Sequence, residues 1–155
     1  MQISLIAVGQ KMPAWVNQGY EEYARRMPPE CPLQLIEIPL TRRSKASDIS
    51  RLMDREGEQM LAAIKKDSLV VAMEVTGKPW STPQLADHIT GWMQSGRNIA
   101  LLVGGPEGLA TACQKRADLK WSLSCLTLPH PLVRIVIAEQ LYRALSILKH
   151  HPYHK

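Results

Sequence analysis

Near its carboxyl end, the chain has two apolar runs that break abruptly into glycine or proline before a helical pattern begins. The first is LLVGGPEG, residues 101–108, and the second is LSCLTLPHPLVR, residues 123–134. In α/β proteins, ligands bind where strands end and loops expose backbone groups. The two breaks therefore predict one pocket built by two loops. The first loop lacks the Lys-Ser/Thr ending of a P-loop and does not match G-x-G-x-x-G, which argues against ATP and NAD.

Strand-like and helix-like patterns alternate along the chain. Strands are expected at Ile3–Gly9, Leu33–Ile38, Leu69–Val75, Asn98–Gly104 and, as a shorter one, Leu123–Leu128. Helices are expected at Pro13–Met27, Asp48–Lys65, Thr82–Gln94, Leu109–Leu119 and Leu132–Lys149. Strands alternating with helices predict an α/β fold, with a mostly parallel sheet and helices on both faces. The length of 155 residues favours a single domain, residues 1–155.

Composition and targeting signals point to a cytoplasmic protein without metal. No apolar run approaches the ~18 residues that a membrane helix needs, so no membrane association is expected. The first residues, MQISLIAVGQ, do not resemble a signal peptide. The three cysteines are widely spaced and form no C-x-x-C motif, which indicates reduced thiols and no zinc site.

The net charge of +5 is compatible with a nucleic-acid partner but does not require one. A slightly basic protein without such a partner is equally consistent with the charge. Its placement is more informative, because Arg42, Arg43 and Lys45 stand in a short polar connection. Cations on loops can reach phosphates, whereas those on the middle of a helix face are usually only solvated.

The last helical pattern is apolar around most of its circumference, from Leu132 to Leu148. Such a helix is buried on more than one side. Its own sheet would cover one side, and a second copy of the chain would cover another, which predicts a homodimer. The alternative is a central helix in a monomer.

Three glycines in the first loop, Gly104, Gly105 and Gly108, exceed what a simple turn needs. Glycine lets a ligand approach the backbone closely, although a tight strand-to-helix turn would also use it. Glu107 either accepts a hydrogen bond from a ligand or favours the start of the following helix.

The second loop alternates small polar and apolar residues. Its main-chain groups could serve an adenine ring while Leu123, Leu126 and Leu128 flank it. An ordinary amphipathic strand would show the same alternation.

Ionisable residues at the start of the last helix are the candidates for chemistry. His130 lies between two prolines and is the best general-base candidate, with a backbone-bonded helix-entry histidine as the alternative. Arg134 could hold an anionic oxygen through two N–H groups, or it could form a surface ion pair. Glu139 and Arg143 are four residues apart and could pair with each other.

The chain ends in HHPYHK, residues 150–155. A frayed terminus is the default for such a tail, and adjacent histidines do not by themselves make a metal site. Tyr153 among these cations would nevertheless suit RNA, which proteins bind by stacking and by phosphate contacts.

Several motifs resemble those of the ribosomal large-subunit RNA methyltransferase H family. They are VGGPEG, LTLPHPLVR, Tyr142-Arg143 and HHPYHK, together with IAVGQKMPAWV, IEIP, EGEQML and GKPW. The resemblance covers the whole chain. Members are small, knotted, SPOUT-type enzymes that methylate N3 of a pseudouridine in 23S rRNA.

The resemblance implies a deep C-terminal trefoil knot, a rare exception to unknotted topology. It also implies a homodimer that acts on 23S rRNA of the assembled 70S ribosome at a site shared by both subunits. The implied cofactor is S-adenosylmethionine. Its implied contacts are Met73, Gly104, Leu123, Ser124, Cys125, Leu126, Thr127 and Leu128.

For catalysis, Arg134 is expected to stabilise the deprotonated base. His130 or the tail residues Tyr153 and His154 would orient or deprotonate it. Two alternatives remain from the sequence: a ribosome assembly factor that binds cofactor or RNA without turnover, and a related tRNA methyltransferase.

Overall fold

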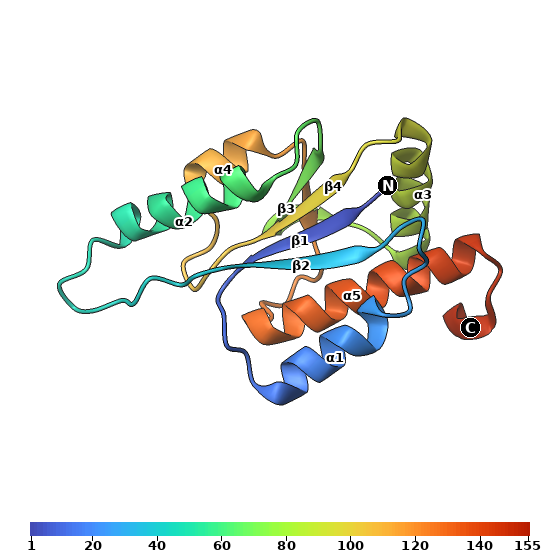
Figure 1. Cartoon of the computed structure of the whole chain (residues 1–155), viewed down its shortest axis with the longest axis horizontal. Coiled ribbons are helices and arrows are strands. Elements are labelled where there is room, and N and C mark those ends of the chain that lie inside the picture. Colours follow the sequence, from blue (N-terminus) through green and yellow to red (C-terminus); the bar gives the residue numbers. More distant parts are fainter.

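The computed structural model describes residues 1–155 as one five-stranded sheet with helices on both faces (Figure 1). All strand pairs are parallel, in the order β2-β1-β4-β3-β5. The strands are β1 (Ile3–Val8), β2 (Leu33–Ile38), β3 (Leu69–Pro79), β4 (Ile99–Val103) and β5 (Leu119–Ser122). The helices are α1 (Ala14–Ala24), α2 (Ile49–Ala63), α3 (Thr82–Ser95), α4 (Thr111–Arg116), α5 (His130–Leu148) and the 3-10 helix η1 (Pro152–His154). The predicted α/β architecture is confirmed.

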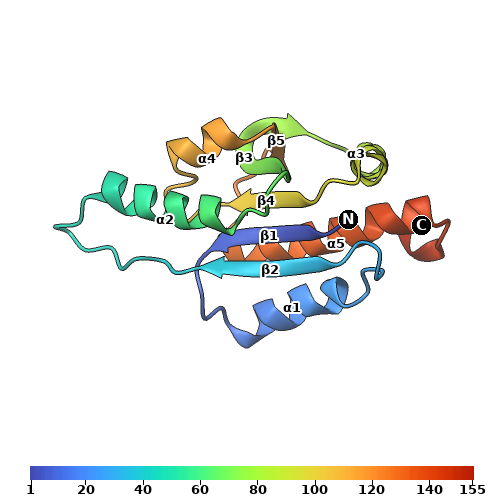
Figure 2. The same ribbon diagram turned by 45° about the horizontal axis from the view of Figure 1, so that its top comes forward.

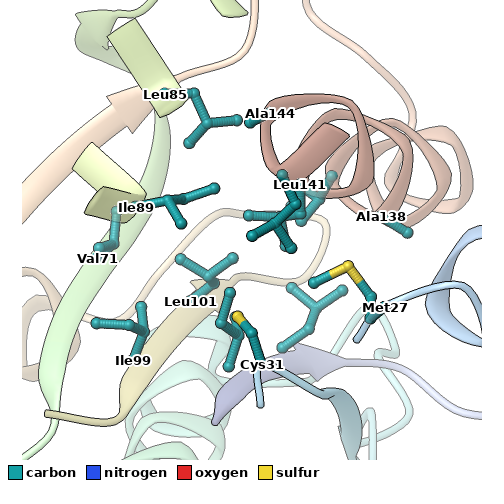
Figure 3. Close-up of a cluster of buried hydrophobic side chains, with 14 of the residues drawn as sticks. Met27, Cys31, Val71, Leu85, Ile89, Ile99, Leu101, Ala138, Leu141 and Ala144 are labelled. Carbon is teal, nitrogen blue, oxygen red and sulfur yellow. The ribbon is translucent and has the colours of Figure 1, made fainter. Parts of the chain in front are cut away.

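The two faces of the sheet carry separate cores. On one face α1, α3 and α5 pack against the sheet around residues such as Leu101, Ile89 and Leu141 (Figures 2 and 3). On the other face α2 and α4 enclose a smaller core that includes Met60 and Cys113. The interior strand β1 is buried along its whole length. Strands covered on both faces read as continuous apolar runs, as ISLIAV does.

Local capping signals account for the helix starts. The Asp48 side chain accepts a hydrogen bond from the Arg51 N–H and caps α2. At α3 the cap is Ser81, which forms a capping box with Gln84. Gly96 ends α3 in a left-handed conformation that glycine tolerates without strain.

The short strand predicted near Leu123–Leu128 exists, but it does not include those residues. The last strand lies earlier, at Leu119–Ser122, and residues 123–128 form a loop. Period-two alternation identifies a strand only where a neighbouring strand can pair with it, and β3 pairs with residues 119–122. Helix α4 is also shorter than expected, and α5 begins earlier, at His130.

Helix α5 is covered by the sheet, by α1 and by α3. This packing accounts for much of its apolar surface, including the fully buried Ile137 and Leu141. Large apolar side chains nevertheless remain exposed on α1 and α5, namely Trp15 and Leu132. The homodimer therefore stays a prediction at this point.

None of the helices is both long and apolar enough to cross a membrane. The three cysteines are free thiols, with Cys31 and Cys113 buried and Cys125 exposed. No group of three or more potential ligands is clustered to hold a metal ion.

Candidate functional site

A cavity of about 570 Å³ opens at the carboxyl ends of β3, β4 and β5. Its walls are the loop after β4, the loop after β5, the outer part of β3 and the first turn of α5. The two loops singled out in the sequence therefore meet at one cavity. This edge of a parallel sheet is where α/β proteins bind ligands.

The glycines of the first loop have distinct structural roles. A Cβ on Gly104 would lie 2.4 Å from the backbone carbon of Gly108, so only glycine fits there. Gly108 has a φ of +89°, which other residues rarely adopt. The Gly108 N–H donates to the Gly105 carbonyl at 3.0 Å and closes the turn. The absence of a side chain at Gly104 therefore lets two parts of the same loop pack backbone against backbone.

The second loop, Leu123–Pro129, presents unpaired backbone groups to the cavity. The N–H groups of Leu123, Thr127 and Leu128 have no hydrogen-bond partner within the chain, whereas the Leu126 N–H donates to Ser124 Oγ at 2.9 Å. Backbone groups are obligatory hydrogen-bonding groups, so a ligand or water must satisfy them. The side chain of Leu126 is 71% exposed, a large apolar surface at the cavity.

Of the wall formed by β3, only Met73 was predicted from the sequence. Strand β3 leaves its register with β5 between Met73 and Lys78, both of which lie opposite Trp121. The residues between them bulge, and Glu74, Val75 and Thr76 line the cavity. The only local signal was Gly77, where a Cβ would lie 2.8 Å from the β5 backbone.

His130 joins the first loop to α5. Arg134 Nε donates to His130 Nε2 at 3.2 Å, so His130 Nδ1 carries the proton and donates to the Gly104 carbonyl at 3.1 Å. Burial lowers the pKa of His130 below its ordinary value of 6.5, and the Arg134 guanidinium lowers it further. The ring is thus neutral at pH 7, with both nitrogens engaged inside the protein.

Arg134 is buried, with 1% of its side chain exposed. Its Nη1 donates to Glu37 at 2.8 Å and its Nη2 donates to the Gly9 carbonyl at 2.7 Å. The guanidinium therefore forms an ion pair, but an internal one that connects α5 with the ends of β1 and β2. The alternative of a surface ion pair was wrong.

The tail folds back along α5 and reaches its middle, at Glu139. Tyr153 Oη donates to Glu139 at 3.1 Å, and the same carboxylate pairs with Arg143 at 2.6 Å, as the spacing of these two residues predicts. Partial burial, together with the neighbouring Tyr23 and Glu139, raises the pKa of Tyr153 to about 12. The phenol is therefore a hydrogen-bond donor at neutral pH.

Within one chain, the tail does not line the cavity. With a rise of about 1.5 Å per residue, Glu139 lies about 13 Å along α5 from His130. Of the candidate catalytic residues, His130 lines the cavity, while Arg134, Tyr153 and His154 do not. Of the candidate cofactor contacts, all line it except Cys125: Met73, Gly104, Leu123, Ser124, Leu126, Thr127 and Leu128.

Glu107 lines the cavity and also takes a role that the sequence did not indicate. Its carboxylate pairs with Arg43 at 2.8 Å, and Arg43 also pairs with the buried Glu56 of α2. Arg43 holds the pKa of the Glu107 carboxyl below its usual range. The glycine loop is thus fixed by Arg43 as well as by His130.

A parallel sheet with a glycine-rich loop and an open loop at its carboxyl edge is an arrangement in which α/β proteins bind ligands. The sequence matches the family described as "Predicted SPOUT methyltransferase" over residues 1–154. The chain belongs to the SPOUT methyltransferase family.

Two curated relatives, both named "Ribosomal RNA large subunit methyltransferase H", are each 59% identical to this chain over 155 residues. They come from Thioalkalivibrio sulfidiphilus and Hahella chejuensis, and each match covers 100% of this chain and 99% of the relative. A solved structure, described as a probable methylase family protein from Haemophilus influenzae, has a TM-score of 0.56. It is 14% identical, and the match covers 99% of this chain and 70% of the other. The likeness to this structure concerns the fold alone.

The depressed pKa of His130 generates a pH dependence of stability. The unfolded chain binds this proton more tightly than the folded protein does, so the free energy of unfolding falls as pH drops below about 6.5. We expect His130→Gln, which lacks the titrating ring, to show a shallower fall between about pH 7 and pH 5. Urea unfolding at a series of pH values measures both slopes.

The pH dependence of stability that remains in the variant has a contribution from His88. The pKa of His88 is also lowered, by burial first and by Lys78 second. Identical slopes in wild type and His130→Gln would contradict the assignment of a neutral, buried His130.

Proposed function

We propose that this protein transfers a methyl group from S-adenosylmethionine to N3 of a pseudouridine in 23S rRNA of the assembled 70S ribosome. The main support is the combination of the cavity at the carboxyl edge of the sheet with full-length relatives at 59% identity that are named as ribosomal RNA large subunit methyltransferases. A ribosomal substrate implies a cytoplasmic location.

The residues present fit such a cofactor. The cavity volume of about 570 Å³ lies within the roughly 300–1,000 Å³ of small-molecule sites. Leu123, Leu126 and Leu128 offer apolar contact to an adenine ring, and the free N–H groups of this loop offer hydrogen bonds to its edge. The remaining proposed contacts are Met73, Gly104, Ser124, Cys125 and Thr127. Cys125 would contribute through its backbone, because the cavity is lined by its neighbours.

Methyl transfer requires alignment of the acceptor nitrogen and removal of its proton. When bound, S-adenosylmethionine supplies an electrophilic methyl group. Alignment of two reactants can lower the barrier by up to ~7–11 kcal/mol, and a positioned base contributes roughly 10²–10⁴-fold. The protein must therefore hold the two loops rigidly and provide a proton acceptor.

We assign His130 and Arg134 to the first of these tasks. The His130 Nδ1–H fixes the Gly104 carbonyl, and Arg134 fixes His130 through its other nitrogen. Arg134 is buried and fully engaged, so it acts through His130 and not on the substrate ring.

We assign proton handling to the tail. His154 Nδ1 lies 2.5 Å from the His151 carbonyl and donates to it, so Nε2 is the acceptor whenever the ring is neutral. Tyr153, held protonated, is suited to orienting the base by donating a hydrogen bond.

This division of labour requires a homodimer. The tail does not line the cavity of its own chain, and its contact at Glu139 lies about 13 Å along α5 from His130, so a second copy must bring its tail to that cavity. The exposed apolar side chains of α1 and α5, Trp15 and Leu132, are the surface we propose for this contact.

We also propose that the carboxyl segment forms the trefoil knot of this family. Helix α4 packs with α2 on one face of the sheet, and α5 packs on the other face. The chain therefore changes faces through Leu123–Pro129, which passes against the glycine loop at the His130–Gly104 contact. Stretching the denatured chain by residues 1 and 155 should stop short of full extension, since a knot tightens. Full extension would contradict the knot.

The direct test of the function is transfer of a labelled methyl group. We expect label on rRNA of 70S ribosomes, at one pseudouridine, and little on free large subunits or tRNA. Gly104→Ala should abolish transfer and weaken S-adenosylmethionine binding at least tenfold, because its Cβ would overlap the Gly108 backbone. Calorimetry measures the binding.

Gly91→Ala is the matched control, because a Cβ at Gly91 of α3 meets nothing within 4 Å. It should bind and transfer like wild type. Cofactor binding without label on any RNA would favour a non-catalytic assembly factor, and label on tRNA alone would favour a tRNA enzyme.

Mixed dimers test whether two chains share each site. Gly104→Ala damages the cavity and His154→Ala damages the tail, so each variant alone should be inactive. Random exchange between the two variants should restore about a quarter of wild-type activity, because half of the dimers then hold one intact site. No recovery after verified exchange would place cavity and tail of one site in the same chain.

A further inference from the structure

The connection between β2 and α2, residues 39–48, extends away from the sheet as an open arm (Figures 1 and 2). We call this segment the basic arm. Arg42 and Lys45 are exposed on it, and neither forms an ion pair or a hydrogen bond with another residue. The only carboxylate in the segment, Asp48, is used as the cap of α2. The arm therefore presents two free positive charges.

Arg43 stands between these two residues but faces inward. Its five N–H donors make five hydrogen bonds: with Glu56 through both Nη atoms, with Glu107 through Nε and Nη2, and with the Thr41 carbonyl at 2.6 Å. A fully engaged guanidinium is not available to an external phosphate. Arg43 is an anchor, and its neighbours are the free cations.

The anchor connects the arm to the glycine loop. Glu107 belongs to that loop, and Glu56 is buried directly behind it, since a Cβ on Gly105 would lie 3.6 Å from Glu56 Oε2. Leu40 at the root of the arm would lie 3.5 Å from the same position. The arm thus begins at the carboxyl edge of the sheet, on the outer side of the loop that lines the cavity.

The outer part of the arm is ordered by its own hydrogen bonds. The Ser44 N–H donates to Ser47 Oγ at 2.8 Å, and the Ser47 N–H donates back to the Ser44 carbonyl at 3.0 Å. This turn lies next to the capped start of α2. Arg42 and Lys45 are therefore carried on a shaped segment and not on a random coil.

We propose that the basic arm binds the phosphate backbone of the RNA substrate, and that Arg43 is the positioning residue that fixes the arm beside the methyl-donor site. The inference rests on the proposed function for its substrate. RNA is the favoured partner because it brings phosphates close to the cavity where its base must react, and exposed Arg and Lys side chains supply the matching charge.

The test compares two charge-matched double variants on 70S ribosomes. In Arg42→Gln/Lys45→Gln the arm loses both free cations. The control, Lys65→Gln/Lys66→Gln, loses two exposed cations from the α2–β3 connection, at the opposite edge of the sheet. We expect the arm variant to raise the KM for ribosomes with kcat and S-adenosylmethionine affinity unchanged, and the control to match wild type.

Salt dependence gives a second readout. Each phosphate contact contributes about 0.7–0.9 to the slope of log affinity against log salt concentration, so the arm variant should lose about 1.4–1.8 from that slope. An arm variant with the KM and slope of wild type would overturn the proposal. The proposal would also be overturned if the control variant changed the KM and the salt slope as much as the arm variant does.

Arg43→Lys tests the anchor separately. It keeps the charge but cannot reproduce the bonds to Glu56, Glu107 and Thr41 together. We expect a raised KM for ribosomes in a protein that remains folded, as a thermal melt would verify. An unchanged KM would overturn the positioning role. Wild-type protein that methylates no ribosome would instead contradict the proposed function, so the two failures are distinguishable.

Discussion

A chain of hydrogen bonds through one buried guanidinium connects the parts of this protein that form its site. Arg134 bonds the Gly9 carbonyl after β1, Glu37 of β2 and the His130 ring, and His130 in turn bonds the Gly104 carbonyl after β4. A buried charge is tolerated only when it is paired and hydrogen-bonded, so each of these partners is needed. The start of α5 is thereby fixed to the edge of the sheet where the cavity opens.

The two loops of the cavity are held in different ways. The glycine loop is constrained at three points: by its own backbone at Gly108, by His130 from α5 and by Arg43 from the arm. The Leu123–Pro129 loop has few internal bonds and keeps several backbone N–H groups free, among them those of Thr127 and Leu128. One wall is therefore pre-shaped by the protein, while the other has hydrogen bonds to offer to whatever enters.

The alternation of strands and helices, most helix boundaries and the meeting of the two loops were predictable from the sequence. These features depend on local signals, such as Asp48 at a cap and the glycines after β4. What could not be predicted depends on partners distant in the chain. The loop at Leu123–Leu128 has the alternation of a strand but no strand pairs with it. The burial of Arg134 depends on Glu37 and Gly9, which are distant in the sequence and form no local pattern with it. The inward direction of Arg43, between two outward-facing neighbours, likewise follows from Glu56 and Glu107.

The bulge of β3 has a consequence for how such a site can change over time. Met73 and Lys78 both lie opposite Trp121, so the ladder closes again after the segment between them has left it. That segment contributes Glu74, Val75 and Thr76 to the cavity wall. Substitutions or length changes there would reshape the cavity while the strand pairing before and after the bulge is conserved. At this wall, substitutions can therefore alter which ligand binds without altering the stability of the sheet.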